Sequence, residues 1–126
     1  MAEQCEIKNC STSGTAAIRS NSGYYVAGIV TNASLSNITN CTNDVEVVSS
    51  MSSNTVVGGI VGKAYSLIIE NCANNSNLSG GLVVAGIAGE FNSGSSQYLP
   101  SKVLCSTNSG IISGRYASGI VGKAYG

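Results

Sequence analysis

Short groups of hydrophobic residues recur in the same order four times along the chain. The first group is an aliphatic phrase that contains a cysteine, and its copies are IKNCSTSG from Ile7, ITNCTNDV from Ile38, IENCANNS from Ile69 and VLCSTNSG from Val103. The cysteines of these copies, at positions 10, 41, 72 and 105, are 31, 31 and 33 residues apart. A second group follows each copy, and its Gly-Ile pairs begin at Gly28, Gly59, Gly86 and Gly119. Repeats of this length predict a stack in which each unit buries its apolar face against the next.

Within each repeat, Val- and Ile-rich segments alternate with clusters of Gly, Asn and Ser, which is the pattern of short strands joined by turns. We place the strands at the Ile-x-Asn-Cys phrase, at LSG or IISG, and at GIVG. The prediction is an all-β fold, a parallel β-solenoid of about four coils with roughly 31 residues and three short strands in each coil. Residues 1–126 then form one repeat domain, with repeats at about 1–34, 35–66, 67–97 and 98–126.

Composition agrees with a turn-rich β protein, because 16 glycines and a charged fraction of 10% are unfavourable for exposed helices. Six basic and six acidic residues give a formal net charge of zero, so we expect no nucleic-acid partner. No apolar run approaches the roughly 20 residues of a spanning helix, so we expect no membrane insertion. The first ten residues lack the apolar region of a signal peptide, which is either removed beforehand or not used.

One cysteine in each repeat predicts an inward ladder of small apolar thiols, formed by Cys10, Cys41, Cys72 and Cys105. Disulfides between neighbouring coils are the alternative, since the Cα atoms would lie within bridging range. We favour free thiols, because side chains of a parallel ladder point the same way. The chain has no histidine and no Cys-x2-Cys spacing, so we predict neither a metal site nor a cofactor.

Two further columns accompany the cysteines. We expect Asn9, Asn40 and Asn71 to form a second inward ladder, in which stacked amides bond from coil to coil. Gly28, Gly59, Gly86 and Gly119 are the repeat glycines. Both faces of the VVGGIV strand are apolar or glycine, which is typical of a strand buried on two sides. One face should line the interior, and the other should meet a partner or a second layer.

The segment GGIVGKAYSLIIENCANNSNLSGG, from Gly58 to Gly81, resembles the GLUG-motif repeat, and weaker copies cover nearly all of the chain. The GLUG motif occurs in bacterial surface proteins, including the non-catalytic part of some IgA-cleaving metallopeptidases. The resemblance implies an extracellular or cell-surface location, a repeat array, and a display or adhesin role. It carries no enzyme with it, and the peptidase motif H-E-x-x-H is absent.

A polysaccharide-active enzyme is one alternative function, because such enzymes also use β-solenoids. Their chemistry needs paired carboxylates at a fixed separation. Asp44 and Glu46 alternate along one strand and could share a face. The equivalent positions one coil away are Ser13 and Thr15, and then Asn75 and Asn77, so no second pair faces them. We therefore predict no catalytic residues.

A carbohydrate- or host-ligand-binding module is the other alternative, because aromatic side chains flanked by polar groups suit sugar stacking. The candidate contact surface is formed by Tyr24, Tyr25, Phe91, Tyr98, Arg115 and Tyr116.

The repeat also predicts self-association. A solenoid normally has caps over its terminal coils, and the sequence shows no cap at either end. From Cys105 to Cys10 of a following copy would be 21 plus 10 residues, which equals the 31-residue period. Head-to-tail stacking of copies would build filaments, since such contacts do not close. The alternative is that a whole number of repeats has been cut from a longer protein. Our preferred function is a structural, extracellular scaffold or adhesin segment that assembles with itself head-to-tail or laterally.

Overall fold

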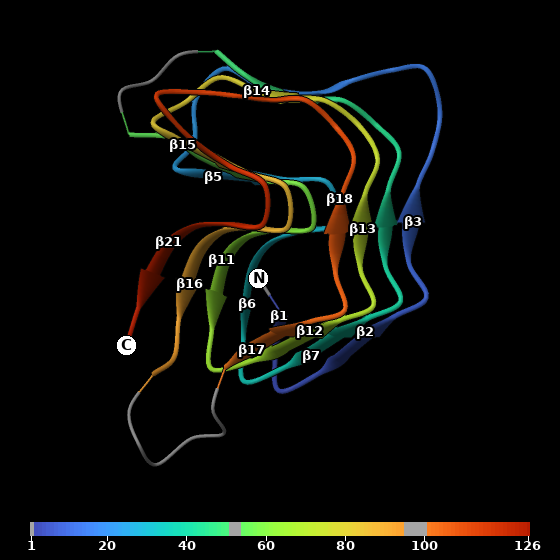
Figure 1. Cartoon of the computed structure of the whole chain (residues 1–126), viewed down its shortest axis with the longest axis vertical. Helices are drawn as coiled ribbons and strands as arrows, with labels where there is room; N and C mark the ends of the chain where they lie inside the picture. The colour runs from blue at the N-terminus through green and yellow to red at the C-terminus, as the bar shows by residue number, and fades with distance from the viewer. Residues whose placement is uncertain (1, 51–53, 95–100) are drawn as a thin grey trace.

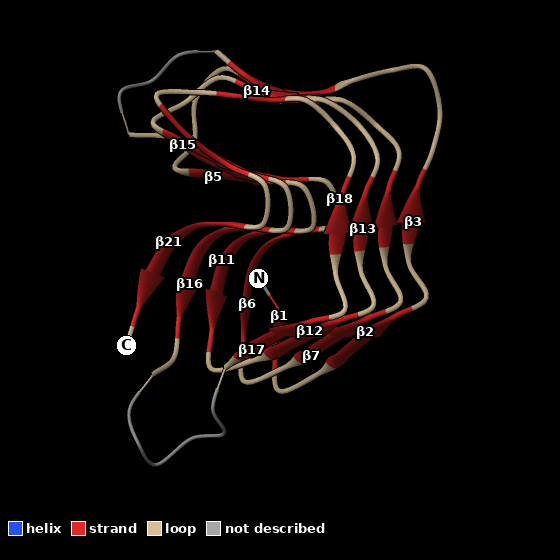
Figure 2. Cartoon of the chain, in the orientation of Figure 1, coloured by secondary structure: helices blue, strands red, loops and turns tan. Residues whose placement is uncertain are grey.

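The structure is a computed structural model that describes residues 2–50, 54–94 and 101–126. All regular elements in these residues are short β-strands, and neighbouring strands in every sheet run parallel. The chain winds through about four coils of about 31 residues, as Figures 1 and 2 show. The predicted all-β fold and parallel β-solenoid are therefore confirmed.

Each coil contributes one strand to each of five sheets, which we number in the order in which the chain enters them. Sheet 1 contains β2 (Glu6–Lys8), β7 (Asn37–Thr39), β12 (Ile68–Glu70) and β17 (Lys102–Leu104). Sheet 2 contains β3 (Ser11–Thr12), β8 (Thr42–Asn43), β13 (Ala73–Asn74) and β18 (Thr107–Asn108). Sheet 3 contains β4 (Ile18–Ser20), β9 (Val47–Ser49), β14 (Leu78–Ser79) and β19 (Ile112–Ser113).

The last two sheets complete the coil. Sheet 4 contains β5 (Tyr25–Ala27), β10 (Val56–Gly58), β15 (Val83–Ala85) and β20 (Tyr116–Ser118). Sheet 5 has five members, β1 (Ala2–Glu3), β6 (Val30–Ser34), β11 (Val61–Tyr65), β16 (Ala88–Asn92) and β21 (Val121–Tyr125). The strand β1 thus lies at the position that the last strand of a preceding coil would occupy.

Five strands in each coil replace the three that we predicted from the sequence. The cysteine phrase is divided between sheets 1 and 2, because its asparagine adopts a left-handed backbone conformation at the corner. The φ angles are 56° at Asn9, 54° at Asn40 and 53° at Asn71. Asparagine tolerates this region better than other residues with a Cβ atom. A corner of one residue therefore breaks what looked like one strand into two.

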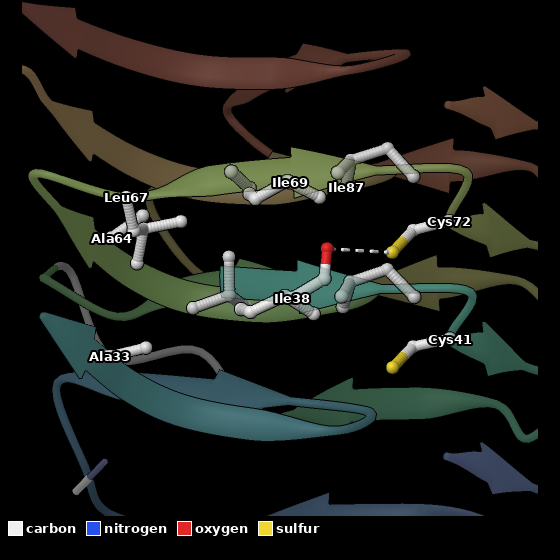
Figure 3. Packing of buried hydrophobic residues seen from close by; sticks show 11 residues of the cluster. Ala33, Ile38, Cys41, Ala64, Leu67, Ile69, Cys72 and Ile87 are labelled. Atoms are coloured by element: carbon white, nitrogen blue, oxygen red, sulfur yellow. Dashed lines mark hydrogen bonds between the residues drawn. The ribbon is translucent and has the colours of Figure 1, made fainter. Parts of the chain in front are cut away.

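The cross-section of the solenoid is pinched into two lobes. The turn from sheet 4 to sheet 5 comes close to sheet 2, which Figure 1 shows at the turn between β15 and β16. The large lobe, in Figure 3, holds Ala33, Ile38, Cys41, Ile60, Val61, Ala64, Leu67, Ile69, Cys72, Ile87 and Ala88. The small lobe holds Val26, Val47, Val57, Leu78 and Val84. The protein thus has two narrow cores, both filled mainly by Val, Ile, Leu and Ala.

The outer face of sheet 4 is covered by sheet 5 of the same molecule. A Cβ atom added to Gly89 would collide with Val56, and one added to Gly122 would collide with Val83. Val56 and Val83 are buried although they point away from the lobes. The second layer expected from the VVGGIV pattern is therefore internal, and the second glycine of GIVG provides the room for it.

Candidate functional site

The strongest polar feature of the interior is a ladder of buried side chains on sheet 2, at the waist between the lobes. Thr12, Asn43, Asn74 and Asn108 occupy the same position in successive coils. The Thr12 hydroxyl donates to Asn43 Oδ1 at 2.6 Å, Asn43 Nδ2 donates to Asn74 Oδ1 at 2.7 Å, and Asn74 Nδ2 donates to Asn108 Oδ1 at 2.7 Å. We call these four residues the waist ladder.

Each amide of the waist ladder also holds its own coil together. Asn43 Nδ2 donates to the Val45 carbonyl at 2.9 Å, and Asn74 Nδ2 donates to the Ser76 carbonyl at 2.7 Å. Both side chains are fully buried, so these hydrogen bonds replace contacts with water that folding removes. The repeat glycines pack on the other side, where a Cβ atom at Gly59 would lie 2.7 Å from Asn74 Cγ.

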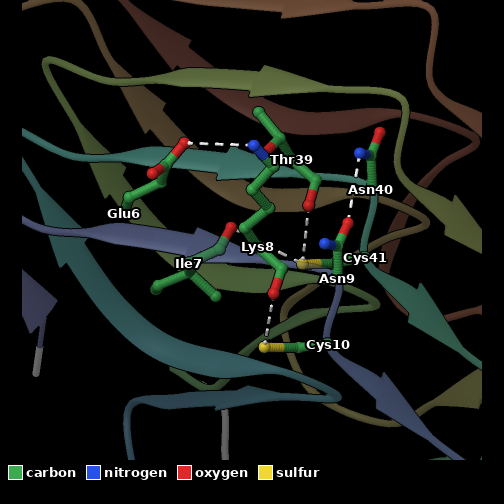
Figure 4. Close-up of polar contacts among 8 residues, drawn as sticks. All are labelled: Glu6, Ile7, Lys8, Asn9, Cys10, Thr39, Asn40 and Cys41. Atoms are coloured by element: carbon green, nitrogen blue, oxygen red, sulfur yellow. Dashed lines mark hydrogen bonds and ion pairs between the residues drawn. The ribbon is translucent and has the colours of Figure 1, made fainter.

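The predicted inward ladder of Asn9, Asn40 and Asn71 is wrong, because all three side chains are exposed. Asn40 Nδ2 does donate to Asn9 Oδ1 at 3.2 Å, but on the outside of the corner, as Figure 4 shows. The left-handed corner places the asparagine outside and the next residue inside. The sequence signal for the waist ladder was a second asparagine, three residues after Asn40 and three residues after Asn71.

The cysteine ladder contains Cys10, Cys41 and Cys72 but not Cys105. Cys41 and Cys72 are buried in the large lobe. The Cys41 thiol donates to the carbonyl two residues earlier, and the Cys10 thiol makes the equivalent contact in the exposed first coil (Figure 4). Sheet 1 pairs Ile69 with Val103, so Ser106 lies beside Cys72, and its hydroxyl accepts the Cys72 amide N–H at 3.3 Å. Cys105 is exposed at the corner, with φ 46°. Aligning the cysteines instead would slip the strand by one residue and turn Val103 outward.

All five cysteines are free thiols, and the two buried ones make the stability depend on pH. Burial raises the pKa of Cys41, and it raises that of Cys72 from 9.0 to about 11. The folded state therefore holds these protons more tightly than the unfolded state, so this stabilisation is complete below pH 9 and is lost as the pH rises towards 11.

We expect the free energy of unfolding of the wild type to fall between pH 9 and 11 relative to that of Cys72→Ala. The difference should change by up to about 1.4 kcal/mol per pH unit, because one additional proton is released on unfolding. Urea denaturation of both proteins at a series of pH values measures this. Parallel stability curves would contradict the prediction.

The candidate contact surface is not one patch. Phe91 packs against the large lobe. Tyr24, which directly precedes β5 of sheet 4, is 70% exposed. Tyr98 lies outside the described residues. Tyr25 and Tyr116 stand at opposite edges of sheet 4, separated by Val56 and Val83. The Arg115 guanidinium lies 5.8 Å from the Tyr116 ring centre, so these two residues do form a pair.

Tyr25 instead belongs to a polar cluster where sheets 4 and 5 meet. The Lys63 amine lies 5.4 Å from the Tyr25 ring centre and 3.6 Å from Glu90 Oε1. The Tyr25 hydroxyl donates to Glu90 Oε2 at 3.3 Å. Burial acts to lower the pKa of Lys63, but the Tyr25 hydroxyl and the Glu90 carboxylate outweigh it and raise that pKa. Lys63 therefore stays charged, and the three groups hold one another in place.

A hollow of about 250 Å³ lies beside this cluster. Its walls come from β1, β5, β6 and β11, and its lining residues are Glu3, Tyr25, Asn32, Ala33, Ser34, Lys63 and Tyr65. We call it the tyrosine hollow. Asn32 Oδ1 is buried there, and no hydrogen-bond partner for it exists among the described residues. Of these residues, Tyr25 could be selected from the sequence, but Asn32, Lys63 and Tyr65 could not, because only the coil stacking brings them together.

The carboxylates Asp44 and Glu46 are both exposed and line one polar hollow of about 400 Å³, so they share a face as expected. Asp44 Oδ1 accepts a hydrogen bond from Asn75 Nδ2 at 2.8 Å. No group of three or more His, Cys, Asp or Glu residues in the described part of the chain is arranged to hold a metal ion. The same residues include no helix long and apolar enough to cross a membrane.

Comparisons with protein-family models, with curated proteins and with solved structures give no match to this chain.

Proposed function

We propose that this protein is a structural, extracellular scaffold or adhesin segment whose coils stack head-to-tail onto a second copy. The observation that carries the proposal is that both end faces of the solenoid display the same inward columns. Ile7 in the first coil and Val103 in the last belong to one column, and Ile18 and Ile112 belong to another. An extracellular location is the part of the proposal that rests on the resemblance to GLUG repeats.

The waist ladder supplies a directional contact between copies. Inner amides donate once within their coil and once to the following coil, whereas Asn108 Nδ2 donates only to the Gly110 carbonyl at 3.0 Å among the described residues. In Asn74 the second N–H bonds to the following coil. The same orientation in Asn108 would direct its second N–H to the Thr12 hydroxyl oxygen of a following copy. The apolar side chains Leu104 and Ile111, which are 40% and 71% exposed, would lose water at the same contact.

Two features of the first coil oppose an undistorted stack onto the last coil of a preceding copy. The strand β1 pairs with Ala33 and Ser34 and so occupies the place that β21 of a preceding copy would take. Thr31 stands where inner coils have glycine. A Cβ atom at the equivalent Gly62 would lie 2.7 Å from the carbonyl oxygen of Thr31 in the preceding coil. The Cβ atom of Thr31 itself would therefore come close to the backbone of a preceding copy. Assembly therefore requires Ala2–Glu3 to leave the sheet edge and the backbone beside Thr31 to shift.

Gly119→Ala tests the proposal. A Cβ atom at Gly119 meets nothing within 4 Å, whereas at Gly86 it collides with the Gly119 carbonyl of the next coil. We expect Gly119→Ala to keep the wild-type melting temperature and to weaken association at least tenfold, because the added methyl group meets the backbone of the following copy. Sedimentation velocity and electron microscopy at increasing concentration measure this.

Thr31→Gly is the complementary variant, and we expect it to promote assembly by removing the misfit at the first coil. Wild-type protein that stays monomeric at high concentration would refute head-to-tail assembly. Equal association of Gly119→Ala and wild type would show that the copies meet through another surface.

A further inference from the structure

We infer that the tyrosine hollow binds one residue of a neutral sugar. Asn32 and Ser34 point from β6 to the same side as Lys63 and Tyr65 from β11, because alternate residues of a strand share a face. The strands pair in register, with Lys63 beside Asn32 and Tyr65 beside Ser34. Tyr25 from sheet 4 closes the hollow on another side. These side chains surround a space large enough for one pyranose ring.

Asn32 is the residue that most clearly indicates a ligand. Its Oδ1 atom is removed from solvent, and no donor reaches it among the described residues. A buried acceptor without a partner destabilises a fold, so its presence needs a compensating role. Asn32 lines the hollow, so a rotation of its amide on binding would present Oδ1 to a sugar hydroxyl, which is a donor of suitable size. The Ser34 hydroxyl and the Glu3 carboxylate, which bond each other at 3.4 Å, offer further acceptors at the rim.

The charge of the hollow selects a neutral ligand. Lys63 is the only cationic lining residue, and its amine is already paired with Glu90, whose side chain is only 15% exposed. Glu3 adds a negative charge at the edge. An anionic sugar would therefore meet a cation that is already paired and the Glu3 carboxylate, which forms no ion pair with the residues that the structure describes, and this disfavours uronic and sialic acids.

Two tyrosine rings give the hollow the apolar surface that a sugar needs for its C–H groups. The position of the Tyr25 ring is held by the hydrogen bond from its hydroxyl to Glu90 and by the Lys63 amine. A ring that is already ordered loses little freedom when a ligand stacks on it. Tyr65 stands two residues beyond Lys63 and offers a second, partly exposed ring.

The hollow also breaks the repeat, as a specific site should and a structural column does not. The positions of Lys63 and Tyr65 are taken by Glu90 and Asn92 in the next coil. The position of Tyr25 is taken by Val56 and then by Val83 in the following coils. The last coil again has Tyr116, Lys123 and Tyr125 at these positions, but the coil before Lys123 has Val83 in place of Tyr25, so no second tyrosine closes a hollow there. The described structure therefore has this arrangement at one place in the stack, and the inference does not depend on head-to-tail assembly.

The test uses the full chain at a concentration at which it is monomeric, with methyl glycosides of glucose, galactose and N-acetylglucosamine as probes. Methyl glucuronide is the acidic counterpart. Titrations followed by amide chemical shifts and by saturation transfer should show weak binding of at least one neutral glycoside, with shifts centred on β6 and β11. Methyl glucuronide should bind at least tenfold more weakly, because its carboxylate meets Glu3.

Three variants locate the site. Asn32→Ala should weaken binding about tenfold while leaving the melting temperature unchanged or higher, because it removes an unpaired buried acceptor. Tyr65→Ser should weaken binding by a similar factor, and Tyr65→Phe should restore it. Tyr24→Ala, outside the hollow, is the matched aromatic control and should bind as the wild type does.

Several results would overturn the inference. They are a lack of binding by every neutral glycoside, equal or tighter binding of methyl glucuronide, and unchanged binding by Asn32→Ala. Equal losses in Tyr24→Ala and Tyr65→Ser would also overturn it, because they would place the contact elsewhere.

Discussion

Replacing Asn74 with alanine is expected to lower the free energy of unfolding by about 3–5 kcal/mol, which would be a large part of the stability of a single domain. The Asn74 side chain is fully buried in the middle of the waist ladder. Its loss removes the acceptor of Asn43 Nδ2 and the donor to Asn108 Oδ1, both at 2.7 Å, and also its bond to the Ser76 carbonyl. The buried amide of Asn43 and the half-buried amide of Asn108 would then lack one partner each, beside a new cavity.

Urea denaturation and thermal melting followed by circular dichroism measure this effect, and a drop in melting temperature of more than about 10 °C is expected. Asn75→Ala is the matched control. The Asn75 side chain also takes part in coil-to-coil hydrogen bonds, with Asp44 at 2.8 Å and with Ser109 at 3.3 Å, but it is exposed. Because water can replace those bonds, we expect a change within about 0.5 kcal/mol. A loss below about 1 kcal/mol in Asn74→Ala would show that the waist ladder adds little to stability.

Gly59→Ala is expected to destabilise the fold at least as strongly, by about 4 kcal/mol or more. The added methyl group would collide with the Gly86 carbonyl oxygen of the next coil and would lie 2.7 Å from Asn74 Cγ. Neither group can move alone, since the carbonyl belongs to the backbone of the waist and the amide is held by the ladder. The two lobes would have to separate at the waist.

Gly119→Ala is the matched control for Gly59→Ala, because Gly119 is the same repeat position in the last coil and has open space around its Cβ. Circular dichroism spectra and melting curves of the two variants make the comparison. If both variants have the melting temperature of the wild type, the close approach of the turn to sheet 2 does not constrain the fold. If both are equally destabilised, glycine is needed for backbone conformation rather than for space.

The repeat itself could be predicted, because one coil cannot bury its own apolar face and the same pattern therefore recurs. Aliphatic residues such as Ile38 and Ile69 mark the inward column directly. The outward direction of Asn40 could not be predicted, because the left-handed corner that turns it outward is a backbone property. The position of Cys105 was missed for a related reason: the cysteine spacing suggested one alignment, but burial of Val103 selects another.

The candidate site, too, could be predicted from the sequence only in part. Tyr25 could be selected as an aromatic residue in a polar context, but its partners Asn32, Lys63 and Glu90 lie up to 65 residues away along the chain. The fold of sheet 5 back onto sheet 4 brings them together, and it depends on glycines whose role is to leave space.

The sequence by itself determined the period, the parallel stack of coils and the aliphatic character of its interior, because burial of apolar side chains at a fixed spacing admits few other arrangements. The tertiary structure alone decided the pinched waist, the buried Asn43–Asn74–Asn108 ladder and the tyrosine hollow. Those features depend on contacts between different sheets of neighbouring coils, and such contacts leave no periodic pattern of hydrophobicity along the chain.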